Sequence, residues 1–310
     1  MSFIEINPMD KDTCYNRGIA LRNNGDIDAA IADFTRAIEL DPDFAAAYSN
    51  RGLAYDYIGH TQGAIADYTR AIDLDPELIV ALVNRGAAHG SMGDREAAIA
   101  DFTRAIELDP KLAVAYGNRG LVHANRGDHE TAIADYTRAI DLDPELKDAF
   151  YKRGLAYDEM GNTEAALADY TRAIELEHDS PHIYTKRGMA YARQGNYGAA
   201  IADYTRSINV MPESLFFRNA YIHRGDAYFG LAQYEDAYAD FETADKIKSD
   251  LASSSGLALT LHALGKIEDA RKLWRELIAK DISYRDADLL KGAPPLAEEA
   301  RKLIAGLDGE

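Results

Sequence analysis

The stretch AAAYSNRGLAYDYIGHTQGAIADYTRAIDLDP, residues 45–76, decides the fold of this 310-residue chain. Apolar residues recur in both halves of the stretch at the spacing of an amphipathic helix. Gly59 suits the end of a first helix, and Pro76 ends a second one because proline cannot continue a helix. The stretch therefore predicts a helical hairpin, with helices over residues 45–58 and 64–74.

The same pattern recurs along the chain at a nearly constant period. Measured on the alanine equivalent to Ala64, the first five intervals are 34 residues, the sixth is 37 and the last is 33. A small residue precedes that alanine by twelve positions and an aromatic residue follows it by four. The small residue lets the two helices approach closely, and the aromatic ring fills the space beside them. These pairs are Gly18–Phe34, Gly52–Tyr68, Gly86–Phe102, Gly120–Tyr136, Gly154–Tyr170, Gly188–Tyr204, Gly225–Phe241 and Ala258–Trp274.

At residues 11–280 this pattern resembles the tetratricopeptide repeat family, whose period is about 34 residues. The resemblance implies an all-α, right-handed helix-turn-helix solenoid (superhelix) of about eight repeats with a C-terminal capping helix. It also implies an inner, concave face lined by the first helix of each repeat. In the second unit the signature residues are Gly52, Tyr55, Ala64, Tyr68, Ala71 and Pro76.

The two ends of the chain depart from the regular pattern. Residues 1–10 contain Ile6-Asn7-Pro8, which matches Leu40-Asp41-Pro42 and predicts the tail of an earlier repeat in a longer protein. The eighth unit is degenerate, and residues 281–310 predict one or two amphipathic helices. We expect these helices to form a C-terminal cap on the array of residues 11–280, because terminal repeats need a polar outer face.

Composition excludes several classes of partner and of site. The net charge of −18 disfavours nucleic acids and anionic lipid surfaces. The single cysteine, Cys14, excludes an internal disulfide and a thiolate metal cluster. No stretch approaches the roughly 20 apolar residues of a membrane span, and the first residues lack a secretory signal. We expect no direct membrane insertion and a cytoplasmic location, or a periplasmic or anchored one if the N-terminus is trimmed.

An arginine precedes each of the seven glycines, and an aspartate stands sixteen residues after that arginine. In the eighth unit both charges are absent, replaced by Leu257 and Leu273. Loss of both together predicts an ion pair between the two helices of one repeat, since one buried partner alone is costly. The pairs are Arg17–Asp33, Arg51–Asp67, Arg85–Asp101, Arg119–Asp135, Arg153–Asp169, Arg187–Asp203 and Arg224–Asp240.

A second arginine column stands on the second helices, three residues before an acidic residue in five units. That spacing places both side chains on one helix surface and predicts a solvated convex face. The pairs are Arg36–Glu39, Arg70–Asp73, Arg104–Glu107, Arg138–Asp141 and Arg172–Glu175.

The inner stripe of the first helices carries the candidate binding residues. An asparagine side chain offers a donor and an acceptor, so a column of asparagines predicts a ladder that bonds the backbone of an extended peptide. It is similar to the asparagine ladder in the repeats of protein O-linked N-acetylglucosamine transferases. Lysines that continue the column suit an acidic side chain or a C-terminal carboxylate. A solvated helix face gives the same polar pattern, and both interpretations stay open. The candidates are Asn16, Asn50, Asn84, Asn118, Lys152, Lys186, Leu53, Tyr57, Leu121, Asn125 and Arg193.

No pattern of residues predicts catalysis. The phosphate-binding, nucleophile and metalloprotease motifs are absent. His89 and His123 stand one repeat apart without a third ligand, which favours packing roles over a metal site. We expect no catalytic residue, cofactor or metal. The sequence predicts a non-catalytic protein–protein interaction scaffold that binds an extended peptide segment along its concave groove. The alternatives are a substrate-docking or regulatory array of a larger enzyme, and a repeat protein that forms homo-oligomers through its N-terminal repeat.

Overall fold

The computed structural model describes residues 10–178, 180–210, 218–290 and 293–307. The expected tail of an earlier repeat at Ile6-Asn7-Pro8 lies outside these residues. The described residues form α-helices and two short 3-10 helices, with no β-strand among them, so the all-α prediction is confirmed.

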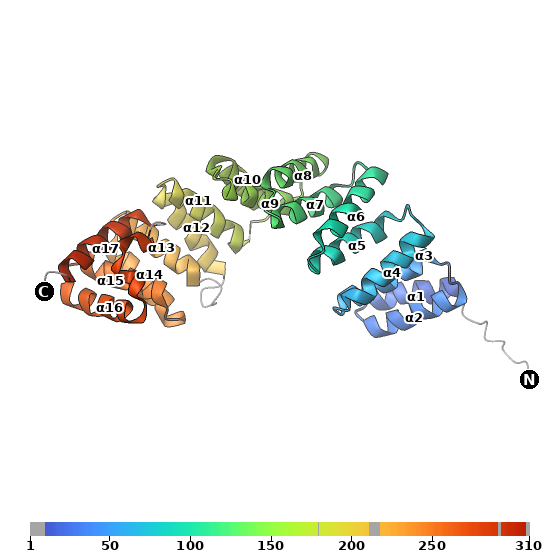
Figure 1. Ribbon diagram of the computed structural model, residues 1–310, viewed down its shortest axis with the longest axis horizontal. Helices are drawn as coiled ribbons and strands as arrows, with labels where there is room; N and C mark the ends of the chain where they lie inside the picture. Colours follow the sequence, from blue (N-terminus) through green and yellow to red (C-terminus); the bar gives the residue numbers. More distant parts are fainter. Residues whose placement is uncertain (1–9, 179, 211–217, 291–292, 308–310) are drawn as a thin grey trace, which may run out of the picture. The chain divides into compact units, whose positions relative to one another are not determined.

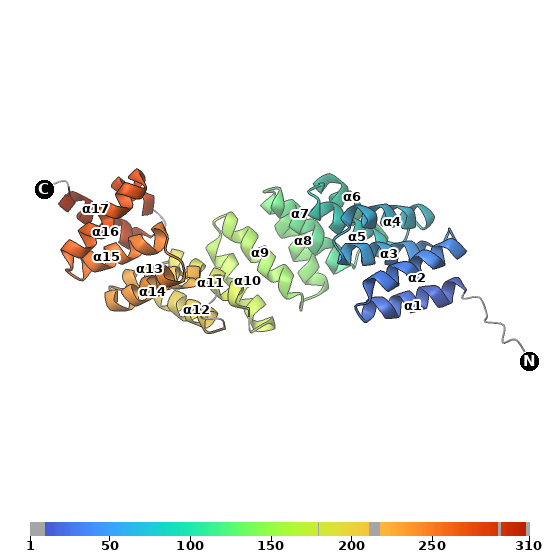
Figure 2. The same ribbon diagram turned by 90° about the horizontal axis from the view of Figure 1, so that it is seen from below.

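The chain divides into two compact units, residues 1–152 and 153–310, and the division falls within helix α9. In the first unit, consecutive helices form hairpins, and the second helix of each hairpin packs on the first helix of the next. Figures 1 and 2 show this order from two directions. The helices are α1 (Lys11–Asn23), α2 (Ile27–Leu40), α3 (Ala45–Tyr57), α4 (Thr61–Leu74), α5 (Ile79–Ser91), α6 (Arg95–Leu108), α7 (Ala113–Asn125), α8 (His129–Leu142) and α9 (Lys147–Glu159).

The second unit continues the alternation of first and second helices and ends on two 3-10 turns and a last helix. Its hairpins α11/α12, α13/α14 and α15/α16 pack in chain order. The elements are α10 (Thr163–Leu176), α11 (Pro181–Arg193), α12 (Tyr197–Val210), α13 (Arg218–Gly230), α14 (Tyr234–Ile247), α15 (Leu251–Ala263), α16 (Ile267–Lys280), η1 (Ile282–Arg285), η2 (Ala287–Leu290) and α17 (Pro294–Leu307).

The hairpin turn is tighter than the sequence predicts. Helix α3 ends at Tyr57, and α4 begins at Thr61, three residues before the predicted start. The physical reason is Gly59, whose φ of +76° lets the chain reverse at once, since glycine adopts the left-handed region without a Cβ penalty. His60 then stands directly before the second helix.

The glycine column packs against the aromatic column, as predicted. A Cβ atom built on Gly52 would lie 2.8 Å from the Tyr68 ring, and one on Gly86 would lie 2.9 Å from Phe102. Both rings are almost fully buried. Since real Cβ atoms do not approach other atoms so closely, only glycine lets the first helix lie on the ring of the second.

After α16 the chain forms the two 3-10 helices η1 and η2 and then the α-helix α17. Helix α17 packs on α15, α16 and α13. The Trp274 indole N–H donates to the Tyr284 carbonyl at 3.2 Å, and His262 Nδ1 lies 2.5 Å from Glu299 Oε1. A capping role for this segment stays a prediction. None of the described helices is long and apolar enough to cross a membrane.

Candidate functional site

The arginine column pairs with the aspartate column in every one of the first seven repeats, so that prediction is confirmed. In a typical pair, Arg119 donates from Nε and Nη2 to the two carboxylate oxygens of Asp135, at 2.9 and 2.8 Å. The aspartates are only 5–6% exposed. Burial raises the pKa of Asp240 even though Arg224 opposes this, which shows how costly these carboxylates are to bury. The arginine column therefore has a structural role, because its guanidinium groups pair with aspartates of the protein instead of binding a phosphate.

The same arginines make a further hydrogen bond that the sequence did not predict. Nη1 of Arg119 donates to the hydroxyl of Thr103 in the preceding repeat at 3.1 Å. Arg85 and Thr69 make the equivalent bond, as do Arg187 and Thr171. The threonine that follows the aromatic residue in the first six repeats was the available signal. These bonds tie each repeat to its neighbour.

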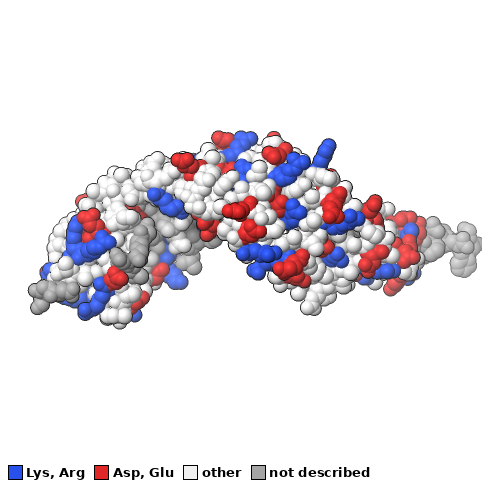
Figure 3. All heavy atoms as spheres, turned by 45° about the horizontal axis from the view of Figure 1, so that its top comes forward, with Lys and Arg blue, Asp and Glu red and all other residues white. Residues whose placement is uncertain are grey.

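The outer arginine column forms its predicted pairs where glutamate follows. Arg36 pairs with Glu39 at 2.8 Å and Arg104 with Glu107 at 3.1 Å. Arg70 turns instead to Asp43, because the side chain of Asp73 is one methylene shorter. These groups are about half exposed, and such pairs contribute little to stability. On the face drawn in Figure 3, acidic and basic side chains are interspersed.

His89 and His123 each lie beside an aspartate of the turn that follows the first helix of their repeat. His89 Nδ1 is 3.6 Å from Asp94, and His123 Nδ1 is 3.4 Å from Asp128 without hydrogen-bond geometry. Over the part of the chain that the structure describes, no group of three potential metal ligands gathers around them or elsewhere.

The asparagine column is not uniform. Asn50 is engaged within the protein: its Oδ1 accepts from Arg22 at 2.6 Å, and its Nδ2 donates to Tyr15 Oη and to the Ala46 carbonyl. Asn16 is exposed, and Asn84 and Asn118 are half-buried. Among the described residues, none bonds the side-chain amides of these three. Asn16, Asn84 and Asn118 therefore keep donors and acceptors for a ligand.

A groove of about 530 Å³ opens in the inner stripe of the third and fourth repeats, between α5 and α7. It brings together three of the predicted binding residues, Asn118, Leu121 and Asn125. The remaining lining comes from small residues of α5, from Val122, and from Arg95 and Phe102 of α6. The α5 and turn residues are Gly86, Ala87, Gly90, Ser91 and Gly93.

The groove forms beside Gly90, where the repeat has a glycine and therefore no side chain. In the second repeat, Asp56 occupies the position of Gly90 and accepts a hydrogen bond from the Tyr68 hydroxyl at 3.0 Å. In the third repeat Gly90 has no side chain, and Phe102 has no hydroxyl to need a partner. The space above the ring therefore stays open. The position varies among the regular repeats, where Arg22, Asp56, Ala124, Asp158 and Ala192 are equivalent to Gly90, so the sequence alone does not single out Gly90.

The other predicted residues lie outside this groove. In the second repeat, Leu53 is 37% and Tyr57 is 76% exposed, an unusual exposure for large apolar groups. Lys152 and Lys186 are half-buried and belong to different units. Neither lysine forms an ion pair with any residue in the described ranges. Arg193 is already paired with Asp158 of the preceding repeat.

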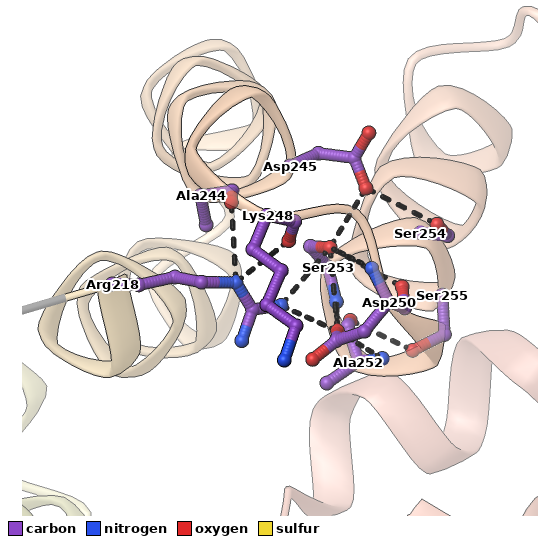
Figure 4. Close-up of polar contacts among 9 residues, drawn as sticks. All are labelled: Arg218, Ala244, Asp245, Lys248, Asp250, Ala252, Ser253, Ser254 and Ser255. Carbon is purple, nitrogen blue, oxygen red and sulfur yellow. Dashed lines mark hydrogen bonds and ion pairs between the residues drawn. The ribbon is translucent and has the colours of Figure 1, made fainter. Parts of the chain in front are cut away.

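A buried polar network in the second unit was not predicted. Arg218 of α13 is 6% exposed; its Nε donates to the Lys248 carbonyl at 2.8 Å, and its Nη2 pairs with Asp250. Figure 4 shows Arg218 pointing at the end of α14 and the start of α15. Asp250 caps α15 by accepting from the backbone amides of Ala252 and Ser253. Loss of the Asp-Pro pair at this corner, where Lys248-Ser249 stands, was the available signal.

Comparison with known proteins agrees with this architecture. Sequence profiles described as "TPR repeat" match residues 18–56, 123–161 and 159–195. Profiles described as "Tetratricopeptide repeat" match residues 45–78, 79–112, 102–134, 181–213, 219–251 and 251–276. No curated protein matches the chain.

Several solved structures resemble the chain. The crystal structure of MamA has 30% identity and a TM-score of 0.50, covering 55% of this chain and 92% of MamA. A tetratricopeptide repeat protein from Parabacteroides merdae has 20% identity and a TM-score of 0.58, covering 81% of this chain and 98% of that one. YrrB, described as a TPR protein with an unusual peptide-binding site, has 24% identity and a TM-score of 0.55, covering 64% of this chain and 97% of YrrB. The last two likenesses show the fold.

Proposed function

Because the chain belongs to the tetratricopeptide repeat family, we propose that it is a non-catalytic protein-interaction scaffold that binds an extended peptide segment in the groove between α5 and α7. The observation that carries the proposal is the groove itself. It lies on the stripe where the sequence analysis expects a ligand, and it gathers Asn118, Leu121 and Asn125 around an apolar floor. Polar groups at a few fixed points in an otherwise apolar hollow are typical of binding sites.

The spacing of the two asparagines suits an extended chain. Asn118 and Asn125 stand seven residues apart on α7, which is about 10 Å along a helix. About three residues of extended peptide cover that distance. Each amide can donate to a peptide carbonyl and accept from a peptide N–H, while Leu121 between them contacts an apolar side chain.

The rest of the stripe extends the proposed site. Asn84 continues the ladder toward the second repeat, where the exposed Leu53 and Tyr57 offer apolar area to a longer ligand. Asn50 contributes less than the other asparagines, because its amide already bonds Arg22 and Tyr15. Lys152 supplies a cation at the end of the first unit, and Lys186 is a separate candidate within the second unit.

The experiment uses a phage-displayed library of random 12-residue peptides, selected on the immobilised full chain. Enriched peptides are synthesised, and their affinity is measured by fluorescence anisotropy. We expect Asn118→Ala with Asn125→Ala to weaken binding by roughly tenfold, which corresponds to about 1.4 kcal/mol, or one to two hydrogen bonds of about 1 kcal/mol each. Arg104→Ala is the matched control, because Arg104 is half exposed on the outer column. Its variant should bind like the wild type.

Two results would count against the proposal. One is an absence of enriched peptides on the wild-type chain. The other is equal affinity of the asparagine double variant and the wild type, with circular dichroism showing that both are folded.

Self-association through the N-terminal repeat stays a separate prediction. Thr13 and Asn16 of α1 are exposed, and the Arg17 side chain is half exposed. Static light scattering over a range of protein concentrations tests it, and a molar mass that stays at 34.1 kDa would exclude it.

A further inference from the structure

Arg95 is an unopposed cation at the edge of the groove. It is the first residue of α6, it is exposed, and it lines the groove. It forms no ion pair with any residue in the described part of the chain. The other second helices of the regular repeats begin with residues that are uncharged or, at His129, weakly basic. These are Ile27, Thr61, His129, Thr163, Tyr197 and Tyr234.

Helix stability gives no reason for an arginine at this position. The N-terminus of a helix carries partial positive charge, so a cation in the first turn is unfavourable. The neighbouring carboxylates have other nearest partners. Asp94 accepts a hydrogen bond from the Ala97 amide at 3.2 Å, and Glu96 lies 3.9 Å from Arg126. Arg95 therefore keeps its charge available for a group outside the chain.

The chemistry of the lining gives the class of that group. Arg95 is the charged side chain among the residues that line the groove, and the floor below it is apolar, formed by Phe102, Leu121 and Val122 over the bare backbone at Gly90. We propose that the groove selects a peptide in which a bulky apolar side chain stands within two residues of an aspartate or glutamate. The apolar side chain lies over Gly90 and the carboxylate binds Arg95. This inference rests on the proposed function.

Local contact rather than net charge produces this selectivity. A guanidinium matches a carboxylate with two parallel hydrogen bonds. The net charge of −18 acts at long range, where salt screens it beyond about 8 Å, and it slows the approach of an acidic peptide. Once the peptide is bound, the Arg95 contact distinguishes acidic from basic segments.

The test repeats the peptide selection on three full-length chains: the wild type, Arg95→Glu and Arg104→Glu. We expect the wild type to enrich peptides with Leu, Ile, Phe or Met close to Asp or Glu. Arg95→Glu should lose the acidic preference and enrich Lys or Arg in its place. Arg104→Glu is the charge-matched control, because Arg104 is half exposed on the outer column of α6 and does not line the groove. It should keep the wild-type preference.

Gly90 tests the apolar part of the inference. A Cβ on Gly90 would lie 3.8 Å from Val122 and 3.9 Å from the Cβ of Ala98, which is ordinary contact, so Gly90→Ala should fold and bind. Gly90→Leu should fill the hollow and weaken binding of the selected peptides. For an acidic peptide selected on the wild type, Arg95→Glu should lower the affinity roughly three- to tenfold, as expected for an exposed charge at the edge of a site.

The outcomes separate this inference from the proposed function. If the wild type enriches no peptide, the proposed function fails and this inference fails with it. If peptides are enriched and depend on Asn118 and Asn125, yet Arg95→Glu enriches the same sequences, only the acidic selectivity is overturned. If Gly90→Leu binds the selected peptides like Gly90→Ala, the apolar anchor is overturned.

Discussion

At the scale of single residues, one guanidinium holds three helices together. Arg119 bonds Asp135 within its own repeat and Thr103 in the repeat before, and it lies 5.7 Å from the centre of the Tyr116 ring. The hydrogen bond to Asp135 raises the pKa of the guanidinium, so the guanidinium stays charged at any ordinary pH. Because water has little access to either group, replacing one of them would leave the other charge buried without a partner. We therefore expect a repeat to have both residues or neither.

We predict that Arg119→Ala lowers the free energy of unfolding by about 3 kcal/mol, because it leaves the Asp135 carboxylate buried without a counter-charge. Chemical denaturation followed by circular dichroism measures the change. The control is the double variant Arg119→Leu with Asp135→Leu, which copies Leu257 and Leu273 of the eighth repeat and should lose less. A single variant as stable as the wild type would refute the role of the pair.

Ala232 is a second residue-scale case, because its φ of +57° is in the left-handed region where the other turns between paired helices have glycine. An alanine there costs about 1 kcal/mol relative to glycine. We predict that Ala232→Gly raises the melting temperature. The reverse change at an equivalent turn, Gly161→Ala, should lower it, since Gly161 has a φ of +74°. An Ala232→Gly variant that melts below the wild type would show that the left-handed backbone at Ala232 does not cost stability.

At the scale of the elements, the junction of α13, α14 and α15 replaces a turn used elsewhere in the array. After α2, Asp41 turns the chain by accepting from the Asp43 amide at 3.1 Å. After α14 the equivalent residue is Lys248, whose side chain has no acceptor. Arg218 bonds the Lys248 carbonyl instead and pairs with the capping Asp250. The network thus closes one helix and starts the next.

This network predicts a dependence of stability on pH. Burial tends to raise the pKa of Asp250, but bonds from the Ser253 amide and Arg218 outweigh burial and lower it below 3.8. A lowered pKa in the folded state stabilises the protein above the ordinary value, and this contribution is lost as pH falls through the folded pKa. Asp250→Asn should therefore reduce stability at pH 7 and flatten its fall between about pH 5 and 3.

Melting temperatures from pH 7 to pH 3 measure this effect. Glu268→Gln is the control, because Glu268 is 84% exposed and pairs only with a neighbour on its own helix. Its curve should follow that of the wild type. An Asp250→Asn curve parallel to the wild-type curve over the whole range would show that the network does not titrate.

At the scale of the whole molecule, more apolar side chains are buried near the end of the second unit than at the start of the first. In the second unit, α14 to α17 share one core that includes Trp274, Leu277 and Leu303, each at most 1% exposed. In the first unit, α1 buries only Cys14 and Gly18 among its described residues. Repeat arrays are stabilised by nearest-neighbour contacts, so regions with little buried apolar area open first.

We predict that amide hydrogens of α15 and α16 exchange more slowly than those of α1 and α2. Hydrogen–deuterium exchange with mass spectrometry measures this directly. Leu303→Ala should speed exchange in α15 and α16 while leaving α1 unchanged, because the cavity lies in the core of the second unit. Uniform acceleration along the chain would mean that the protein opens as one cooperative unit.

The sequence by itself determined the repeats, the hairpins and the arginine–aspartate pairs. Each of these depends on residues of one hairpin, Gly52 against Tyr68 or Arg119 against Asp135, and the repetition of a short-range contact makes it visible in a single chain. The inner stripe was visible for the same reason, since Asn84 and Asn118 recur at one helix position.

Only the tertiary structure decided which parts of that stripe are available. Asn50 is occupied by Arg22 and Tyr15 of the repeat before it, and the groove opens where Gly90 of one repeat meets Leu121 of the next. Arg218 likewise bonds residues of the following helices. Such contacts join neighbouring repeats through side chains that differ from unit to unit. Their geometry follows from how one hairpin packs on another, which a single sequence does not specify.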